Sequence, residues 1–498
     1  MSMPFVDQKF TFTQPDGTKI KVRGTGNQHQ ATFTTLDGYT VLQDPVSGFF
    51  HYAEEAGTPH PQPTGIPTGA VKPRVLGLSA GVKPQPAPSG VIPFVSPGLP
   101  RSPSRWQKRR EEHRAQLLAA LANGIAPAPP QRQTVGVYIG LCLLIQFPDI
   151  KGSIKQADVN DFCNKPGYSG FGNNGSVRDY FFDVSDGKLT YTNIVTSWYT
   201  AKKPRKYYTD ETVEQPLRAR ELILEALAYH VSKGFDFSGL TADDQQYIYA
   251  INVFYAGKRT NNWAKGLWPH SFHLQAPVQL APGKLAHDYQ ITDMPSELTL
   301  GTFCHENGHM ICDFPDLYDY GYESNGVGTY CLMCAGGNAN PKNPVRIGAY
   351  LKHAAGWTTK VTSMVPGTNV QLAADKNEFG FLRRNKTEYF IVESRIQAGR
   401  DASLPDAGLA IWKIDEVGDN SNEAMTAASH YECSLVQADG AADLEMGVNN
   451  GGPGDLFAQG GSFSPTSRPD SRWWDGSPSN LDIHNISTPS PTITFSCS

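Results

Sequence analysis

Residues 301–319 read GTFCHENGHMICDFPDLYD, with two histidines four positions apart around a glutamate. On an α-helix, residues i and i+4 lie on one face about one turn apart, so His305 and His309 can direct imidazole nitrogens at the same metal ion. Glu306 lies on the neighbouring face, where it can accept a proton from a water that the ion activates. This H-E-x-x-H spacing is that of zinc peptidases, and it predicts a helix that carries a zinc site.

The alternative interpretation of the same segment is a helix whose two histidines bind no metal. Its surroundings favour zinc. Leu298, Leu300 and Phe303 are apolar and bury the front of the helix, and the small residue Gly308 leaves space near the ion. Carboxylates that can complete a metal site follow downstream. We therefore expect a buried helix that binds a metal ion.

The third metal ligand is expected among three aspartates that follow the helix. In the longer pattern H-E-x-x-H-x-x-G-x-x-H, the positions of the glycine and of the last histidine hold Cys312 and Pro315 here. Proline cannot coordinate a metal and disfavours helix at the residue before it. Asp316 comes one residue later and offers a carboxylate oxygen, so it is the predicted ligand. Asp313 and Asp319 are the alternatives, as ligands or as partners that orient an imidazole.

A methionine follows in GTYCLMCAGGNANP, within a segment rich in turn residues. A methionine in a tight turn after such a helix can form an apolar floor beneath the metal, so Met333 is the candidate for this Met-turn, against the simpler interpretation of core filling. Attack on a carbonyl also requires a group that stabilises negative charge. Tyr330 and His270 are candidates by motif position, although a structural role is the simpler interpretation of each.

The chain of 498 residues is long enough for several domains. Hairpin signals at Asp16-Gly17 and Asp37-Gly38 predict a small β module, and a Pro, Ala and Gly-rich stretch then predicts a linker with one short helix. Alternation of strands and helices follows. A short helix that runs into a β-hairpin is predicted over 175–195, and a helix is predicted over 214–233, with an apolar stripe at Leu224, Leu227, Ala228 and Val231. Strands separated by turns end the chain. The predicted parts are 1–55 (β-rich), 56–133 (linker), 134–360 (α/β) and 361–498 (β-sandwich).

The segments HENGHMICDFPDLYD and YCLMCAGG, preceded by INVFYAG and LWPHSF, resemble the immune-inhibitor-A-like family of secreted zinc metalloproteases. GSVRDYFFDVSDGKLT, EYFIVESR, GLAIWKID, LVQADG and RWWDG extend the resemblance from about residue 134 to the end, and the N-terminal β module is similar to the propeptides of that family. Familiar members carry a glycine and an aspartate seven and ten residues after the first histidine, where this chain has Cys312 and Pro315. The aspartate of this chain, Asp316, comes one residue later. The resemblance implies a metzincin-like α/β zincin fold, hydrolysis of proteins or peptides, zinc, an N-terminal proregion and structural calcium.

Eight cysteines, an even number, favour disulfides and an oxidising compartment, so we expect an extracellular protein although no signal peptide is visible. If the helix reaches Cys312, that residue and Cys304 lie about 12 Å apart, too far to bridge. Each is then expected to pair with Cys331 or Cys334. By exclusion, the remaining pairs are expected to be Cys142 with Cys163 and Cys433 with Cys497.

A linker before the catalytic module suggests a zymogen that is cleaved to become active. No cysteine precedes Cys142, so a thiolate from the N-terminal part cannot bind the zinc. Inhibition must then be steric or use a side chain such as Asp16, Asp37 or His51.

The charge balance limits the partners of this protein. Lys and Arg number 43 and Asp and Glu number 48, which gives a net charge of −5 without a basic block, so nucleic acid is excluded as an expected partner. No apolar run is long enough to span a bilayer, and the mean hydropathy is −0.39. We expect a monomeric secreted zinc endopeptidase that acts on protein or peptide substrates. The alternative is a binding or adhesion protein with an inactive zincin fold.

Overall fold

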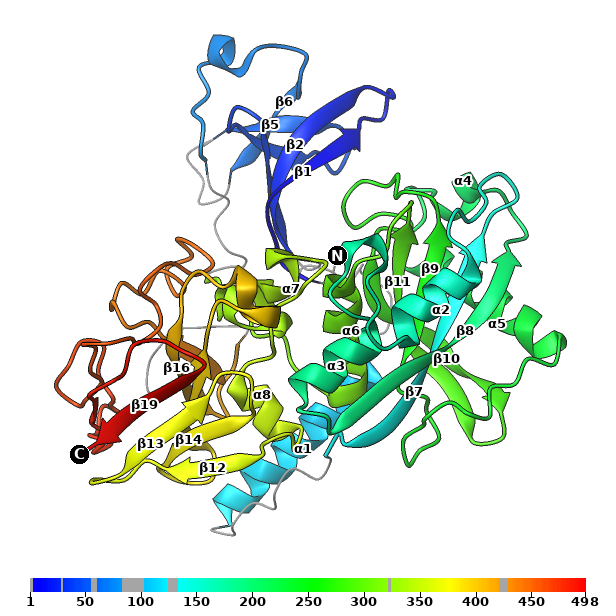
Figure 1. Cartoon of the computed structure of the whole chain (residues 1–498). Helices are drawn as coiled ribbons and strands as arrows, with labels where there is room; N and C mark the ends of the chain where they lie inside the picture. Colours follow the sequence, from blue (N-terminus) through cyan, green and yellow to red (C-terminus); the bar gives the residue numbers. More distant parts are fainter. Residues whose placement is uncertain are drawn as a thin grey trace.

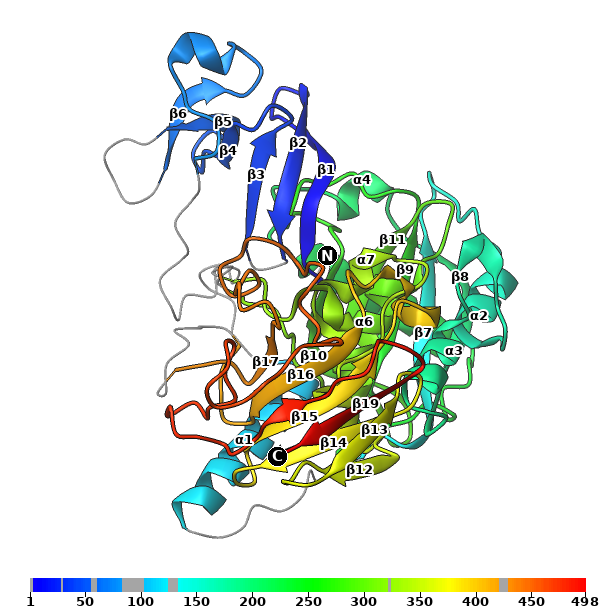
Figure 2. The same ribbon diagram turned by 60° about the vertical axis from the view of Figure 1, so that its left-hand side comes forward.

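The computed structural model describes residues 3–27, 30–54, 61–82, 103–123, 133–320, 324–420 and 429–498. These residues form three main parts (Figure 1): an N-terminal sheet, a central α/β module and a C-terminal β module. The N-terminal sheet projects from one end of the molecule in both views, while the α/β and C-terminal modules lie side by side (Figures 1 and 2).

The N-terminal sheet has six strands in sequence order, each antiparallel to the next. Its strands are β1 (Phe5–Thr13), β2 (Lys19–Gly26), β3 (Ala31–Thr35), β4 (Thr40–Gln43), β5 (Phe50–Glu54) and β6 (Gln62–Pro67). The hairpins predicted at Asp16-Gly17 and Asp37-Gly38 are confirmed, since they join β1 to β2 and β3 to β4. The predicted limit at residue 55 is too early, because β6 continues the sheet and a short 3-10 helix, η1 (Pro73–Leu76), follows it.

Aromatic contacts dock the N-terminal sheet onto the α/β module. Phe10 packs against Trp268 with ring centroids 5.5 Å apart, and Phe33 packs against Trp263 at 5.8 Å. Asn262 adds two hydrogen bonds to the backbone of Thr13, at 2.9 and 3.0 Å. The apolar core of the sheet therefore continues into the loop before β10.

The α/β module is built on a five-stranded sheet of order β10-β11-β9-β7-β8. Its strands are β7 (Gly136–Gln146), β8 (Leu189–Thr200), β9 (Ile251–Ala256), β10 (His270–Ala281) and β11 (Lys284–Met294). Strands β7, β8, β9 and β11 pair in parallel, and β10 is an antiparallel edge strand. The continuous apolar run in β7 is explained by burial on both faces of the sheet, as in other parallel sheets.

Helices cover both faces of this sheet, and the last of them packs on the C-terminal β module. They are α2 (Gln156–Asn164), α3 (Val177–Val184), α4 (Arg205–Tyr208), α5 (Leu217–Ser232), α6 (Leu300–Cys312), α7 (Gly337–Ala339) and α8 (Ala349–Ala354), with shorter turns η2 (Gly170–Gly172), η3 (Gly328–Tyr330) and η4 (Leu332–Gly336). One core cluster joins α2, α3 and α6 to the sheet, and a second joins α5 to the opposite face.

Two local predictions for this module are wrong. The segment after α3 was expected to form a hairpin, but it forms the single strand β8, which pairs in parallel with β7. The helix predicted over 214–233 is present as α5, yet Leu224 and Val231 are 39% and 43% exposed. The buried side of α5 carries Leu222, Ile223, Ala226 and Leu227, because the sheet contacts that side.

The C-terminal β module consists of two sheets, of order β12-β14-β15-β16-β17 and β13-β19-β18. The strands are β12 (Lys360–Ser363), β13 (Asn369–Ala373), β14 (Glu378–Arg383), β15 (Glu388–Arg395), β16 (Gly408–Asp415), β17 (Cys433–Val436), β18 (Ile483–His484) and β19 (Thr492–Cys497), with η5 (Gly399–Ser403) between β15 and β16. A core cluster that includes Phe390, Ile411 and Phe495 lies between the sheets. The other face of the larger sheet shares the core of α6, through residues such as Ile391 and Trp412.

The helix predicted within the linker is confirmed as α1 (Arg105–Ala122). Ser104 caps it: its side chain accepts from the Gln107 backbone N–H, and the Gln107 side chain accepts in return from the Ser104 N–H. Leu117 is its only buried residue, so α1 has no apolar stripe, although it lies against α6. No helix of the described ranges combines the length and apolar character needed to cross a bilayer.

The prediction of disulfides is wrong for this structure, because all eight cysteines are free and buried. Cys433 belongs to the core shared with α6, whereas Cys497 lies in the core between the two C-terminal sheets. Cys142 and Cys163 contact each other as thiols, and burial raises the pKa of Cys163 well above its usual value. The cysteines pack as apolar side chains and give no support for an oxidising compartment.

A buried polar network fixes the inner face of α6 to the sheet. Asn307 of α6 donates to Asn252 of β9 at 2.8 Å, and Asn252 donates to Asn193 of β8 at 2.9 Å. Gln290 of β11 and Tyr191 of β8 join the same cluster. Because these groups are removed from water, each hydrogen bond must be made within the network.

Replacing Asn252 with Leu should lower the free energy of unfolding by about 2–4 kcal/mol, because Gln290 and Asn307 then lose a buried acceptor. Denaturant unfolding monitored by tryptophan fluorescence measures this change. A loss below about 0.5 kcal/mol would show that the network does not hold α6 in place.

Candidate metal centre

Helix α6 is buried along nearly its whole length, with Thr302 as the only residue that is not. It ends at Asp313, which adopts a left-handed conformation with φ of 57°. Pro315 follows, and a proline cannot continue a helix. The chain therefore turns back beneath the last turn of α6 and returns Asp316 to the face that carries His305 and His309.

The side chains of His305, His309 and Asp316 converge at one point, and their ligand atoms all lie within 4.8 Å of one another. The two Nε2 atoms are 3.2 Å apart, and Asp316 Oδ1 lies 3.0 Å from Nε2 of His305 and 3.2 Å from Nε2 of His309. All three residues are buried. The i, i+4 spacing thus places both imidazoles on one side of the helix.

Backbone carbonyls orient both imidazole rings. Nδ1 of His305 lies 2.9 Å from the carbonyl oxygen of Leu332, and Nδ1 of His309 lies 2.6 Å from that of Phe314. A carbonyl only accepts hydrogen bonds, so each Nδ1 carries the proton. The Nε2 lone pairs then face each other and Asp316, which is the arrangement that a metal ion requires.

The geometry separates the three candidate aspartates. Of the three, only Asp316 lies with its carboxylate beside His305 and His309. Its Oδ2 accepts a hydrogen bond of 2.8 Å from Tyr320. Asp313 instead binds Arg109 of α1 through contacts of 2.6 to 3.1 Å. Asp319 is buried and accepts from the backbone N–H of Ser324 at 3.0 Å.

Electrostatics favour an ionised carboxylate beside the two rings. Although burial acts in the opposite direction, the charge of Asp316 raises the pKa of His309 to about 9, and Glu306 contributes to the same shift. A metal ion that binds here would therefore displace the proton from Nε2 of His309. Burial would raise the pKa of Asp316, but the imidazoles hold it far below its usual range. A fixed negative charge therefore lies next to two nitrogen donors in a site removed from water.

Glu306 is 1% exposed and lies beside this site. One of its carboxylate oxygens, Oε2, accepts a hydrogen bond from Ser271 of the edge strand β10, while Oε1 has no hydrogen-bond partner. A buried carboxylate oxygen without a partner is costly unless the site binds something else. Ser271 was not predicted from the sequence, because only the fold brings β10 next to α6.

The donor set fits a zinc ion. Two neutral imidazole nitrogens and one carboxylate oxygen form the three-ligand set of catalytic zinc sites, and such sites keep a further position for water or substrate. The unpartnered Oε1 of Glu306 marks where a proton-bearing ligand can bind. Within the described residues, this is the only cluster of three or more His, Cys, Asp and Glu ligand atoms, so the structural calcium implied by the resemblance stays a prediction.

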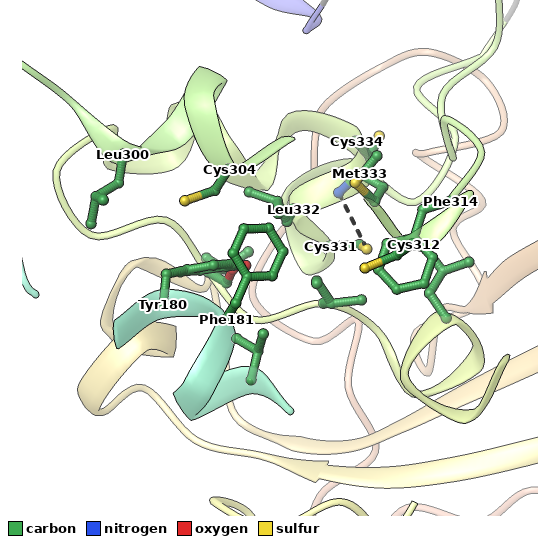
Figure 3. Packing of buried hydrophobic residues seen from close by; sticks show 14 of the residues in the cluster. Tyr180, Phe181, Leu300, Cys304, Cys312, Phe314, Cys331, Leu332, Met333 and Cys334 are labelled. Atoms are coloured by element: carbon green, nitrogen blue, oxygen red, sulfur yellow. Dashed lines mark hydrogen bonds between the residues drawn. The ribbon is translucent and has the colours of Figure 1, made fainter. Parts of the chain in front are cut away.

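The predicted Met333 turn lies against α6 (Figure 3). Met333 is fully buried, and its backbone N–H lies 3.4 Å from Cys331 Sγ. A Cβ atom on Gly308 would lie 2.7 Å from the Met333 sulfur, so the methionine fills the space that the glycine leaves. The carbonyl of the adjacent Leu332 orients His305, which links this turn directly to the metal ligands.

The two residues proposed for charge stabilisation bind elsewhere. The Tyr330 hydroxyl oxygen lies 2.9 Å from a carboxylate oxygen of Asp406 and 3.1 Å from one of Asp455, so its hydrogen is directed at the C-terminal module. His270 bonds the Trp268 carbonyl and Tyr289, and burial lowers its pKa to about 4. Tyr320 lies closer to the candidate metal centre, because its hydroxyl donates to Asp316. Nothing in the sequence distinguished Tyr320 as a group that stabilises negative charge.

Helix α1 lies over the candidate metal centre. Trp106 stacks on the ring of His309 with centroids 4.5 Å apart and planes at 17°. Arg110 pairs with Glu432, the residue before β17, and Arg114 donates to the carbonyls of Val417 and Gly418. The sequence predicted a helix at the basic run RWQKRREEHR, but no local pattern shows which surface that helix contacts.

The suggested blocking residues of the N-terminal sheet have local partners instead. Asp16 accepts from the Thr18 N–H at 2.8 Å, Asp37 accepts from Thr35 at 2.5 Å, and His51 stacks on Phe49. The segment that reaches the histidines is therefore α1 rather than these side chains.

No protein-family model matches this chain, and no curated protein matches it.

Replacing Gly308 with Ala should lower the free energy of unfolding by about 1–3 kcal/mol, because the added methyl group meets the Met333 sulfur. The matched control is Gly239→Ala, where the nearest side-chain atom would lie at an ordinary 3.5 Å. Chemical denaturation of both variants measures the difference. Equal stabilities would show that Met333 does not pack tightly beneath the helix.

Proposed function

We propose that this protein is a zinc-dependent endopeptidase with a metzincin-like catalytic module. The observation that carries the proposal is the buried convergence of His305, His309 and Asp316 beside Glu306, which has one carboxylate oxygen without a partner. The edge strand β10 before α6 and the Met333 turn beneath it agree with this class. Secretion now rests on the resemblance, because the eight cysteines are free and no longer support it.

Each residue of the site has a role in the proposed reaction. His305, His309 and Asp316 would hold the zinc, which when bound polarises a carbonyl and acidifies water. Glu306 accepts the proton of the attacking water and passes it to the leaving amine. Ser271 holds one oxygen of Glu306, so the other stays available for the proton.

The edge strand β10 supports a peptide as the substrate. It pairs with β11 on one side only, and its Ser271 contacts Glu306. A strand edge that pairs with no second strand can offer backbone donors and acceptors to an extended peptide, although on β10 the carbonyl of His273 already accepts from Arg220. A peptide added along β10 would therefore bring its backbone close to the site.

We further propose that the intact chain is a precursor in which α1 blocks the cleft. Trp106 covers His309, and the helix lines a cleft of about 1380 Å³ together with Asp316, Tyr320 and Glu432. Because Leu117 is its only buried residue, α1 is held mainly by polar contacts. Such a segment can leave after cleavage without exposing a large apolar surface.

Replacing Glu306 with Gln should leave the zinc content near that of the wild type and lower casein hydrolysis by about 100-fold or more, because the proton acceptor is lost. Asp316→Asn should lose zinc, and the matched control Asp313→Asn should retain it. Metal analysis and hydrolysis assays on the same samples measure both effects. Absence of zinc from the folded wild type would favour the binding or adhesion protein.

Cutting the chain on both sides of α1, at protease sites inserted within 83–102 and 124–132, should raise casein hydrolysis at least about tenfold after a wash in ~0.5 M salt. A single cut is the control, since α1 then stays tethered at high effective concentration. An intact chain that hydrolyses casein as fast as the doubly cut chain would refute the precursor.

A further inference from the structure

Two arginines of α1 enter one acidic pocket next to the metal centre. Arg109 binds Asp313 through Nε and Nη2, at 3.0 and 2.6 Å, and reaches Asp243 at 3.3 Å. Arg105 reaches the same oxygen of Asp243 at 3.2 Å and Gln245 at 2.8 Å. One carboxylate thus serves two guanidinium groups.

The protein holds the carboxylate of Asp243 in place independently of α1. Its Oδ1 accepts from the backbone N–H groups of Gln245 and Tyr247, at 3.0 and 2.9 Å. Its Oδ2 is the atom that meets both arginines, and the side chain is only 7% exposed. The pocket is therefore preformed by the loop before β9.

Aromatic rings complete the pocket. The guanidinium of Arg105 lies 4.1 Å from the ring centre of Tyr247, and that of Arg109 lies 5.2 Å from the ring centre of Tyr249. This pocket suits arginine better than lysine, because only the planar guanidinium can stack on a ring and also bind a carboxylate through two N–H groups.

The pocket borders the catalytic residues. Asp313 ends α6 and follows His309 by four positions, and the backbone N–H of Asp313 bonds the carbonyl of His309. On α1, Arg109 lies one helical turn from Trp106, the residue stacked on His309. A side chain in this pocket is thus within reach of a peptide bound at the metal.

We propose that Asp243 and Asp313, with Tyr247 and Tyr249, form a specificity pocket that selects arginine in the substrate, and that the arginines of α1 occupy it in the intact chain. This inference rests on the proposed peptidase function. Removal of α1 leaves two carboxylates of like charge beside the aromatic rings, and an arginine side chain of a peptide restores the lost contacts.

The test uses the full chain with α1 loosened by Arg105→Gln, Trp106→Ala and Arg109→Gln. Two quenched peptides differ at one position, arginine or the neutral isostere citrulline. We expect kcat/KM to be at least about tenfold higher for the arginine peptide than for the citrulline peptide, because only arginine makes charge-assisted paired hydrogen bonds. Adding Asp243→Asn should cut this preference to within about threefold, chiefly by lowering kcat/KM for the arginine peptide. Asp236→Asn, an exposed site, is the control for charge.

Binding separates this proposal from the peptidase function. The same peptides, labelled with a fluorophore, are titrated into the loosened chain carrying Glu306→Gln, and anisotropy gives Kd. Tighter binding of the arginine peptide that depends on Asp243 supports the pocket even where no variant hydrolyses either peptide. Equal Kd values, no binding of either peptide, or a preference that survives Asp243→Asn overturn the pocket, whatever the hydrolysis assay shows.

Discussion

The site depends on two hydrogen bonds, in which the Nδ1 atoms of His305 and His309 donate to backbone carbonyls. Leu332 and Phe314 supply those carbonyls, one from the Met333 turn and one from the turn after α6. Each bond fixes a ring orientation and a tautomer, so the Nε2 lone pairs must converge. The left-handed residue Asp313 makes this possible, because it reverses the chain so that Phe314 and Asp316 both return to the helix.

The rest of the α/β module supports the same helix from behind. Asn307 binds Asn252 on the face opposite the ligands, and Gly308 allows Met333 to pack close to α6. The core of α6 continues into the larger C-terminal sheet through Trp412. Displacement of the helix would therefore break buried polar contacts and apolar packing together, which explains how a buried charged site can be maintained.

Local sequence was sufficient where the chemistry depends on spacing within one element. The i, i+4 histidines, the end of the helix before Pro315 and the choice of Asp316 follow from helix geometry and from the properties of proline. Ser271 and Trp106 lie far from α6 in sequence, so no local pattern could assign them to the site. The buried face of α5 was missed because Leu224 is as apolar as Leu222, and only the position of the sheet distinguishes them. The even number of cysteines predicted disulfides that the structure does not contain, because a free cysteine is equally suited to an apolar core and the sequence does not distinguish the two uses.

The contacts of α1 also bear on the choice between an enzyme and a binding protein. A helix that serves only the fold normally buries an apolar stripe, whereas α1 buries Leu117 and otherwise relies on arginines and on Trp106. Ion pairs of this partly exposed kind weaken with salt and bind reversibly. An adhesion module has no evident need for a helix whose Trp106 stacks on His309, nor for a buried Glu306 with an unpartnered oxygen. Both features have a purpose in a peptidase that must stay inactive until it is cut.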